Sequence, residues 1–343
     1  MSLNAMSKDH PKFSELPLDP SHPPHSAWGL WGMDDELGTL NHLTSERTTE
    51  AAKEIKSGTR IGLNWALEQM DFAGDFRQVM KHEIIELGKN MNIGILTETK
   101  DDRITFNTQT SSQWDGLRHW GFDDGRFYNG LTQEEILGNK TSKLGIHGKS
   151  FSHARQAQTN ENSAWAKQGI VGRGVLIDFV SYAARKGIKY DPLDYYAIKL
   201  ETVKEIAEEC NVQFQAGDII LLRTGFTAAF APAALTTKQA LMAKSPFQYP
   251  GMESTFEVLA FLWDTKIAAV AGDCPGFEAW PPSEQAMHQI LLSGFGMPIG
   301  ELFDLEELAK ECEKQKRWTF FFTSQVLNVK GGIASPPNAI AIL

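Results

Sequence analysis

Residues 109–119 read QTSSQWDGLRH, and the interpretation of the whole chain depends on this segment. Asp115 and His119 stand four residues apart, behind two glutamines, Gln109 and Gln113, with the same spacing. Carboxylate, amide and imidazole groups can all bind metal ions, and here they crowd into a stretch rich in Ser, Thr and Gly. The pattern predicts a chelating loop or strand end.

A second pair of donor side chains lies far downstream. His288 falls in an apolar, helix-like segment, and Glu301 follows the glycine-rich run SGFGMPIG at residues 293–300. If the fold brings the two pairs together, they form a metal-dependent hydrolytic site.

Composition narrows the class of protein. The chain has 343 residues, of which 42% are hydrophobic and 22% are charged, so it can bury a large core in one big domain or two ordinary ones. The formal net charge is -10, and the Lys and Arg residues are scattered along the chain. Nucleic-acid binding normally needs a basic surface, so we expect no nucleic-acid partner. An acidic enzyme that acts on a small-molecule substrate is the default interpretation.

Cysteines and apolar runs indicate the compartment. The three cysteines, Cys210, Cys274 and Cys312, have no CxxC spacing, which argues against a disulfide framework and a thiolate zinc site. The longest apolar stretch, residues 258–270, is interrupted by charges and is too short to cross a bilayer. The N-terminal segment carries charges and lacks the apolar core of a signal peptide. We therefore expect a cytoplasmic protein with no membrane partner.

The chain divides into an arm and a domain. Prolines recur near the start and predict an extended arm over residues 1–27, and residues 28–343 are predicted to form a single α/β domain with a mixed central sheet. Thr44 is the expected N-cap of the first of the predicted helices, at 45–57, 132–137, 198–210, 255–263, 283–292 and 306–313. Apolar and β-branched runs predict strands at 60–65, 103–110, 126–129, 219–223, 267–270, 318–323 and 325–329, and a buried strand or a strand-to-helix junction at 174–180.

Together these residues resemble a known family, the cyclase or kynurenine-formamidase-like metal hydrolases. The family motif runs His-x-Gly-Thr-His-x-Asp-x-x-x-His, and its Asp falls on Asp115 and its last His on His119. The two metal-binding histidines of the motif fall on Gln109 and Gln113. Further stretches that look like longer members of the family occur, in order, at residues 28–44, 169–176, 217–219, 271–273 and 331–336.

The resemblance implies a swivelling β/β/α fold and a catalytic metal site. The distal ligands of the family, a His on a helix and a Glu after a glycine-containing loop, match His288 and Glu301. With Asp115 they give three protein ligands and room for water, which is the usual form of a catalytic site. Because glutamines replace the two histidines, we expect one ion per subunit, Zn²⁺ or Mn²⁺. Gln113 is expected as a fourth, oxygen-donating ligand, and Gln109 is a further candidate metal-binding residue.

The resemblance also implies a reaction, the hydrolysis of an amide, formamide, lactone or imide. His119 would take the proton of the attacking water and pass it to the leaving group. Several aromatic residues near the segment, Trp120 among them, could wall a pocket for a ring-containing substrate. The predicted substrate-binding residues are Trp28, Trp31, Trp114 and Tyr128. Because similar family members exchange N-terminal arms between subunits, a homodimer or homotetramer is expected.

Each site residue also has a plainer interpretation. Asp115 before a glycine is typical of a turn, and Glu301 could be an acid at the start of a helix. His119 and His288 could be structural histidines. Two other functions stay open: a lyase or cyclase that uses the metal to stabilise an enolate, and a small-molecule-binding protein that kept the fold but lost catalysis with the two histidines.

Overall fold

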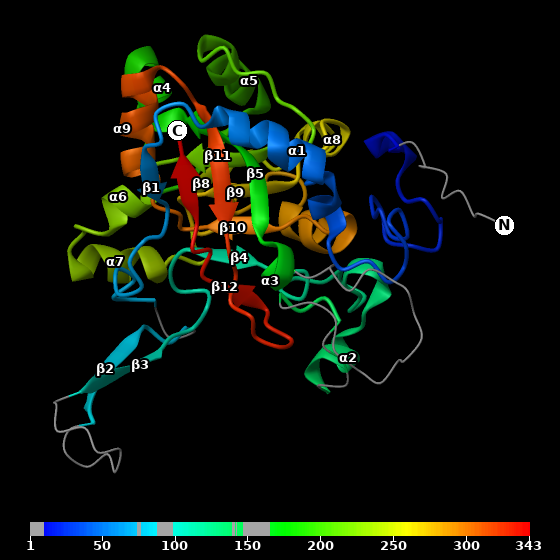
Figure 1. The fold of residues 1–343 in the computed structure, drawn as a ribbon, viewed down its shortest axis with the longest axis horizontal. Helices are drawn as coiled ribbons and strands as arrows, with labels where there is room; N and C mark the ends of the chain where they lie inside the picture. Colours follow the sequence, from blue (N-terminus) through cyan, green and yellow to red (C-terminus); the bar gives the residue numbers. More distant parts are fainter. Residues whose placement is uncertain (1–9, 74–76, 88–98, 139–140, 142, 147–164) are drawn as a thin grey trace.

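The computed structural model describes residues 10–73, 77–87, 99–138, 141, 143–146 and 165–343, and a nine-stranded sheet runs through them (Figure 1). In spatial order its strands are β1 (Arg60–Gly62), β13 (Ile340–Ile342), β11 (Thr319–Ser324), β5 (Ile170–Asp178), β7 (Ile219–Arg223), β9 (Ala269–Gly272), β10 (Ile299–Glu301), β4 (Gln113–Asp115) and β12 (Ala334–Ser335). The four strands from β5 to β10 are parallel, and the remaining pairs are antiparallel. The prediction of an α/β fold with a mixed central sheet is confirmed.

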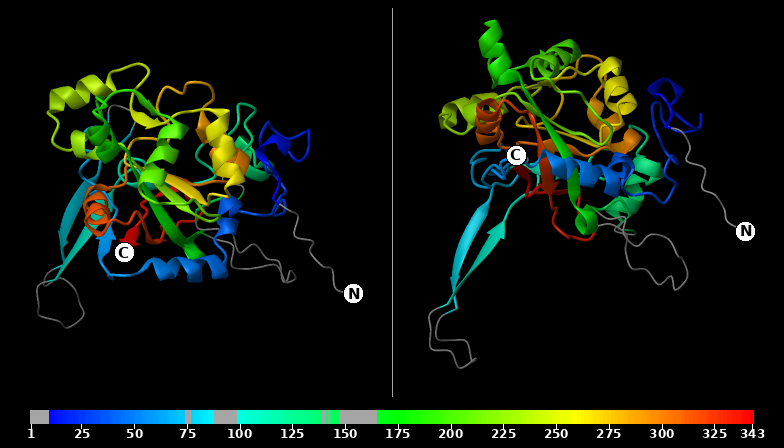
Figure 2. Two further views of the ribbon diagram at one scale, coloured as in Figure 1. Left: turned by 90° about the horizontal axis from the view of Figure 1, so that it is seen from above. Right: turned by 45° about the horizontal axis from the view of Figure 1, so that its top comes forward.

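Helices pack on both faces of this sheet (Figure 2). The α-helices are α1 (Ser45–Ala51), α2 (Gln133–Leu137), α3 (Trp165–Gln168), α4 (Phe179–Lys186), α5 (Leu200–Glu209), α6 (Phe226–Phe230), α7 (Leu235–Met242), α8 (Phe256–Asp264) and α9 (Glu306–Gln315). Shorter 3-10 turns are η1 (Phe13–Glu15), η2 (Gly38–His42), η3 (Ala52–Glu54) and η5 (Tyr128–Gly130), and η6 (Gln289–Phe295) is a π-helix. Within the described ranges, no helix is both long enough and apolar enough to span a bilayer.

Strand β5 shows how the two cores arise. Val175 and Ile177 point to one face, where they pack with α4, α5, α8 and η6, while Leu176 points to the other face, where α9 and β11 contribute the partners. Successive side chains of a strand alternate between faces, so a strand that is buried on both sides must be apolar throughout. This explains the apolar runs at 174–177 in β5, 219–222 in β7 and 269–272 in β9.

Two small pairs of strands complete the fold, the parallel pair β6 (Tyr196–Ile198) and β8 (Pro250–Met252), and the hairpin β2 (Lys81–Glu86) and β3 (Lys100–Thr105). The hairpin, cyan in Figure 1, extends away from the body. Strand β3 ends earlier than predicted because Asn107 turns the chain: its side chain accepts from Gln109 N at 2.9 Å and its carbonyl from Thr110 N at 3.1 Å. This turn, which follows β3, therefore places Gln109 inside the main domain.

Most predicted elements exist, with shifted ends. Thr44 caps α1 as predicted, accepting from the backbone of Arg47, but α1 passes into a 3-10 turn before residue 57. The predicted strands at 126–129 and 325–329 are wrong. The first is a turn with a left-handed residue, Asn129, and in the second Leu327 N bonds the Ser335 side chain instead of a neighbouring strand.

The described part of the predicted arm, residues 10–27, packs against α8 of the same chain. Phe13 is buried in the core, and its backbone N donates to Asp264 Oδ1 at 2.8 Å. Trp263 Nε1 donates to the carbonyl of Pro11 at 2.8 Å. Residues 1–9 lie outside the described residues. The division into an arm and a domain, and the exchange of arms between subunits, stay predictions.

His42, at the end of η2, makes stability depend on pH. Burial, and then the charges of His10, Arg47 and Lys266, lower the pKa of His42 to about 3. A histidine in the unfolded chain has a pKa of ~6.5, so below that pH the unfolded state takes up a proton that the folded state does not. The contribution of neutral His42 to the free energy of unfolding is complete above pH ~6.5. Below that pH it falls by about 1.4 kcal/mol per pH unit, until the pH reaches the pKa of His42 in the folded protein.

We therefore expect the free energy of unfolding to lose about 2 kcal/mol through His42 between pH ~6.5 and ~5. Urea unfolding of the wild-type protein and of His42→Gln at these two pH values measures this loss. The variant should show a pH effect smaller by that amount. The same pH effect in both proteins would contradict the assignment.

Candidate metal centre

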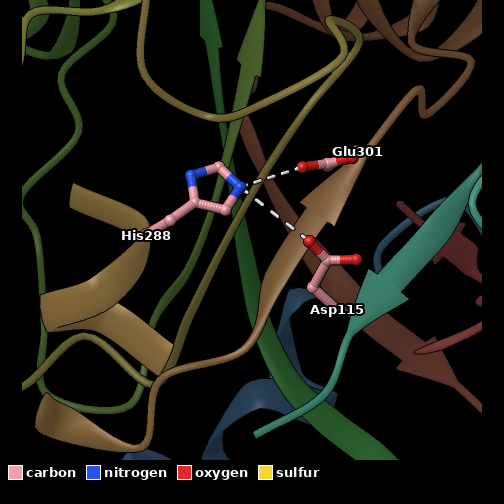
Figure 3. A group of neighbouring side chains, drawn as sticks. All are labelled: Asp115, His288 and Glu301. Atoms are coloured by element: carbon pink, nitrogen blue, oxygen red, sulfur yellow. Dashed lines mark hydrogen bonds and ion pairs between the residues drawn. The ribbon is translucent and has the colours of Figure 1, made fainter. Parts of the chain in front are cut away.

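Three side chains from separate parts of the chain meet beside the edge of the sheet (Figure 3). Asp115 ends β4, Glu301 ends β10, and His288 immediately precedes η6. Strands β4 and β10 are antiparallel neighbours in which Glu301 faces Gln113 and Ile299 faces Asp115. Alternation along β4 therefore puts Gln113 and Asp115 on one face with Glu301, and turns Trp114 to the other face.

The donor atoms of these three residues all lie within 4.8 Å of one another. His288 Nε2 is 3.1 Å from Glu301 Oε1 and 3.8 Å from Asp115 Oδ2. All three side chains are almost completely buried. One imidazole nitrogen and two carboxylates at this separation match the protein ligands of a catalytic divalent metal site.

The electrostatics of the cluster favour a bound cation. Burial, followed by the charge of Asp115, raises the pKa of Glu301 to about 7. Burial lowers the pKa of His288, but the charge and hydrogen bonds of Glu278 and the contact with Glu301 outweigh it and hold the net pKa well above its usual value. Three buried carboxyl groups, those of Asp115, Glu278 and Glu301, thus lie around the single imidazole of His288. A positive ion would relieve the repulsion between them.

Two orphaned oxygens give an independent test of whether a cation fits. Asp115 Oδ2 and Gln113 Oε1 are buried, and neither accepts a hydrogen bond from the described part of the chain. Buried acceptors normally have a partner, and one left without a partner is costly. A metal ion between Asp115, His288 and Glu301 would supply a partner for the Asp115 oxygen. The residues present therefore fit a divalent cation.

The two glutamines orient the carboxylates. Gln109 Nε2 donates to Asp115 Oδ1 at 2.6 Å, and Gln113 Nε2 donates to both Glu301 Oε2 and Gln109 Oε1. Gln109 Oε1 also accepts from Arg77 Nη2 at 3.3 Å, so both of its acceptor positions are occupied. In this arrangement the Gln109 side chain binds Asp115, Gln113 and Arg77, and its assignment as a metal-binding residue stays a prediction. No described residue donates to Gln113 Oε1, and the assignment of Gln113 as an oxygen ligand stays a prediction.

His119 lies at the outer side of the cluster. Its Nε2 is 3.4 Å from Asp115 Oδ2, and its side chain is 22% exposed, whereas that of Asp115 is fully buried. Burial lowers the pKa of His119, although the charge of Asp115 opposes this, and His288 and Arg77 lower it further. A neutral imidazole beside the cluster and within reach of solvent can accept a proton at neutral pH.

The structure does not place the four predicted substrate-binding aromatic residues around the cluster. Trp114 and Tyr128 are completely buried in the core, and Trp114 Nε1 donates to Ser324 Oγ on the face away from the cluster. Trp28 is buried against Phe122.

Trp31 packs on His42 and Trp263. None of the four has a described contact with the three predicted ligands. Instead, the ring of Trp120 lies 5.1 Å from that of His288, and the ring of Trp280 lies 6.0 Å from Trp120, centre to centre. These two partly exposed rings are the aromatic surface beside the cluster.

Two polar residues of the site were missed by the sequence interpretation. Glu278 is completely buried, with Oε2 2.7 Å from His288 Nδ1. Arg77 Nη1 donates to the carbonyl of Gln109 at 2.7 Å. Neither residue belongs to a motif with a recognisable spacing. Glu278 lies in the segment after β9, and Arg77 lies just before β2.

Known proteins share this fold and sequence pattern. A family model described as "Putative cyclase" matches residues 19–279. A crystal structure described as that of a novel cyclase is 27% identical, with a TM-score of 0.78, over 93% of this chain and 99% of that chain. Isatin hydrolase A from Labrenzia aggregata is 17% identical, with a TM-score of 0.53, over 88% of this chain and 98% of its own.

Isatin hydrolase A from Ralstonia solanacearum is 15% identical, with a TM-score of 0.51, over 82% of this chain and 91% of its own. At these identities the two isatin hydrolases show a likeness of fold. No curated protein matches the chain.

Proposed function

Because this chain belongs to the cyclase family, and because its buried Asp115, His288 and Glu301 converge, we propose that it is a metal-dependent hydrolase. The observation that carries the proposal is the cluster itself, in which Asp115 Oδ2 is buried without a hydrogen-bond donor among the described residues. Two proteins with a similar fold are named isatin hydrolases. We propose hydrolysis as the reaction of this chain, and we do not propose isatin as its substrate.

We propose one divalent ion per subunit, Zn²⁺ or Mn²⁺, held by Asp115, His288 and Glu301. Two carboxylates and one imidazole suit either metal. When bound, such an ion acts as a Lewis acid toward a carbonyl group and makes water more acidic. Gln109 and Gln113 support a single ion, because they use their amide hydrogens to orient the carboxylates.

The residues around the cluster have distinct parts in hydrolysis. His119, lowered in pKa by burial, is free of its proton near neutral pH and can take one from water and return it to the leaving group. Asp115, 3.4 Å from His119 Nε2, orients and stabilises the imidazolium that forms. Trp120 and Trp280 offer an apolar surface beside the cluster for the body of the substrate.

We propose an amide, formamide, lactone or imide as the substrate class. Protein loaded with Zn²⁺ or Mn²⁺ is incubated with a panel of cyclic imides, lactones and formamides, in ¹⁸O-labelled water and, separately, in D₂O. A hydrolase puts one ¹⁸O atom into the acid that it forms. Exchange of substrate hydrogen with solvent deuterium, without ¹⁸O uptake, would instead indicate a lyase or cyclase that works through an enolate. Binding without either change would indicate a binding protein.

A further inference from the structure

Glu278 is the least explained charged residue near the cluster. Its side chain is completely buried, and it does not belong to the group of three converging ligands. Both of its carboxylate oxygens lie close to His288 Nδ1, at 2.8 Å and 2.7 Å. The backbone N of His288 donates to the same carboxylate at 3.1 Å. One buried carboxylate thus holds one histidine by ring and backbone together.

The backbone of Glu278 is itself fixed by β8. Met252 N donates to the carbonyl of Phe277 at 2.9 Å, and Ala279 N donates to the carbonyl of Met252 at 2.8 Å. The backbone of Gly251 approaches this segment closely. A Cβ at Gly251 would lie 2.4 Å from the carbonyl carbon of Glu278. The carboxylate is therefore presented from an ordered piece of backbone with little room to move.

This contact decides which nitrogen of His288 is available to a ligand. Both Glu278 oxygens lie within hydrogen-bond distance of Nδ1, and the backbone N of His288 donates to the same carboxylate, so Glu278 is the acceptor in these contacts. Nδ1 must then carry the proton of this hydrogen bond. Nε2 is left on the other side of the ring, facing Glu301 and Asp115.

We propose that Glu278 is a positioning residue that holds His288 through Nδ1–H and so assigns Nε2 to the metal. This inference rests on the proposed metal site and adds to it a residue outside the ligand set. A carboxylate behind a metal-binding imidazole fixes the ring and strengthens it as a ligand, and losing such a partner typically weakens metal binding about 10- to 100-fold.

A purely structural role is the alternative. A buried ion pair often exists without any function, and breaking it destabilises the fold. A structural role predicts that neutralising Glu278 lowers stability but leaves the affinity for metal unchanged in the folded protein. The positioning role predicts weaker binding in protein that is still folded.

The test measures Zn²⁺ affinity by competition with a chromophoric chelator, and the visible spectrum of the Co²⁺-substituted protein. The variants are Glu278→Gln and a control, Glu253→Gln. Glu253 follows directly after β8, accepts from Leu200 N at 2.8 Å at the start of α5, and has no described contact with His288. Circular dichroism and urea unfolding establish that each variant is folded.

We expect Glu278→Gln to bind Zn²⁺ about 10- to 100-fold more weakly than the wild-type protein, with an altered Co²⁺ spectrum, and Glu253→Gln to bind normally. Unchanged affinity and spectrum in folded Glu278→Gln would overturn the inference and leave the metal site standing. A wild-type protein that binds no Zn²⁺ would overturn the metal site and, with it, this inference.

A second measurement needs no variant. ¹⁵N-edited spectra of the wild-type protein with labelled histidine follow the two ring protons of His288 during Zn²⁺ addition. We expect the Nδ1 proton to persist, protected from exchange, while the Nε2 proton disappears. Loss of the Nδ1 proton instead would mean that Nδ1 is the ligand, and would overturn the inference even if Glu278→Gln does not fold.

Discussion

Asp115→Asn is expected to abolish stoichiometric metal binding without lowering the stability of the metal-free protein. The substitution removes one of the two carboxylates of the proposed ligand set. It also removes a negative charge beside Glu301, whose pKa is raised to about 7 by burial and by Asp115. In metal-free protein the two carboxylates destabilise each other, so this variant should unfold at the same or a higher urea concentration.

The pH dependence of the metal-free protein follows from the same pair. The folded-state pKa of Glu301 is raised, so its contribution to stability is complete below the pKa of an unfolded glutamate and is lost as pH rises through about 7. Asp115→Asn should flatten this loss, because the main charge that disfavours ionised Glu301 is gone.

Urea unfolding with and without Zn²⁺ measures both effects. A ligand at about 100 times its Kd stabilises the folded state by about 2.7 kcal/mol, and this gain should be present in the wild-type protein and absent in Asp115→Asn. Asp102→Asn is the matched control, since it removes the same charge from the exposed strand β3. Normal Zn²⁺ stabilisation of Asp115→Asn would show that the ion binds elsewhere.

His119→Ala is expected to keep the metal and lose turnover. The His119 ring lies beside the cluster but has no place among the three converging donor atoms, so metal content should stay at the wild-type level. Removing a general acid–base group typically slows the chemical step about 10²- to 10⁴-fold. The expected result is a fall of this size in kcat on any substrate that the wild-type protein hydrolyses.

The pH profile separates this role from a structural one. Burial lowers the pKa of His119, so wild-type kcat should rise with pH, with a midpoint below the usual histidine pKa. This limb of the profile should be missing in His119→Ala. His82→Ala, on the exposed strand β2, is the matched control. A fully active His119→Ala protein would remove His119 from the mechanism.

The fold was predictable where local sequence and tertiary environment agree. The apolar run at 219–223, bounded by a Gly-Asp turn, is β7 with the predicted bounds. The predicted strand at 325–329 failed because the side chain of Ser335 takes the backbone hydrogen bond of Leu327. The predicted helix at 283–292 begins only near His288, because Ser283 and Gln285 bond to Ser254 across a loop. Such tertiary contacts leave no local pattern.

The residues of the candidate site that could be predicted are those that stand at a fixed spacing or in a fixed order in the sequence. Asp115 and His119 share one segment, and the order of His288 and Glu301 matches a family pattern. The direction of an amide is set by contacts, so the role of Gln109 as a donor to Asp115 needed the structure. Trp114, adjacent to Asp115 in sequence, points the opposite way because β4 alternates between faces. Glu278 reaches His288 only through the packing of the segment against β8.

The proposed metal site depends first on how much metal the wild-type protein holds. The protein is purified without chelator and without a nickel column, and its metals are counted per chain by plasma mass spectrometry. We expect about one Zn or Mn ion per chain, held by Asp115, His288 and Glu301. A chain that holds no metal, even after reconstitution with Zn²⁺ or Mn²⁺, would contradict the proposed site and point to a small-molecule-binding protein on a cyclase fold.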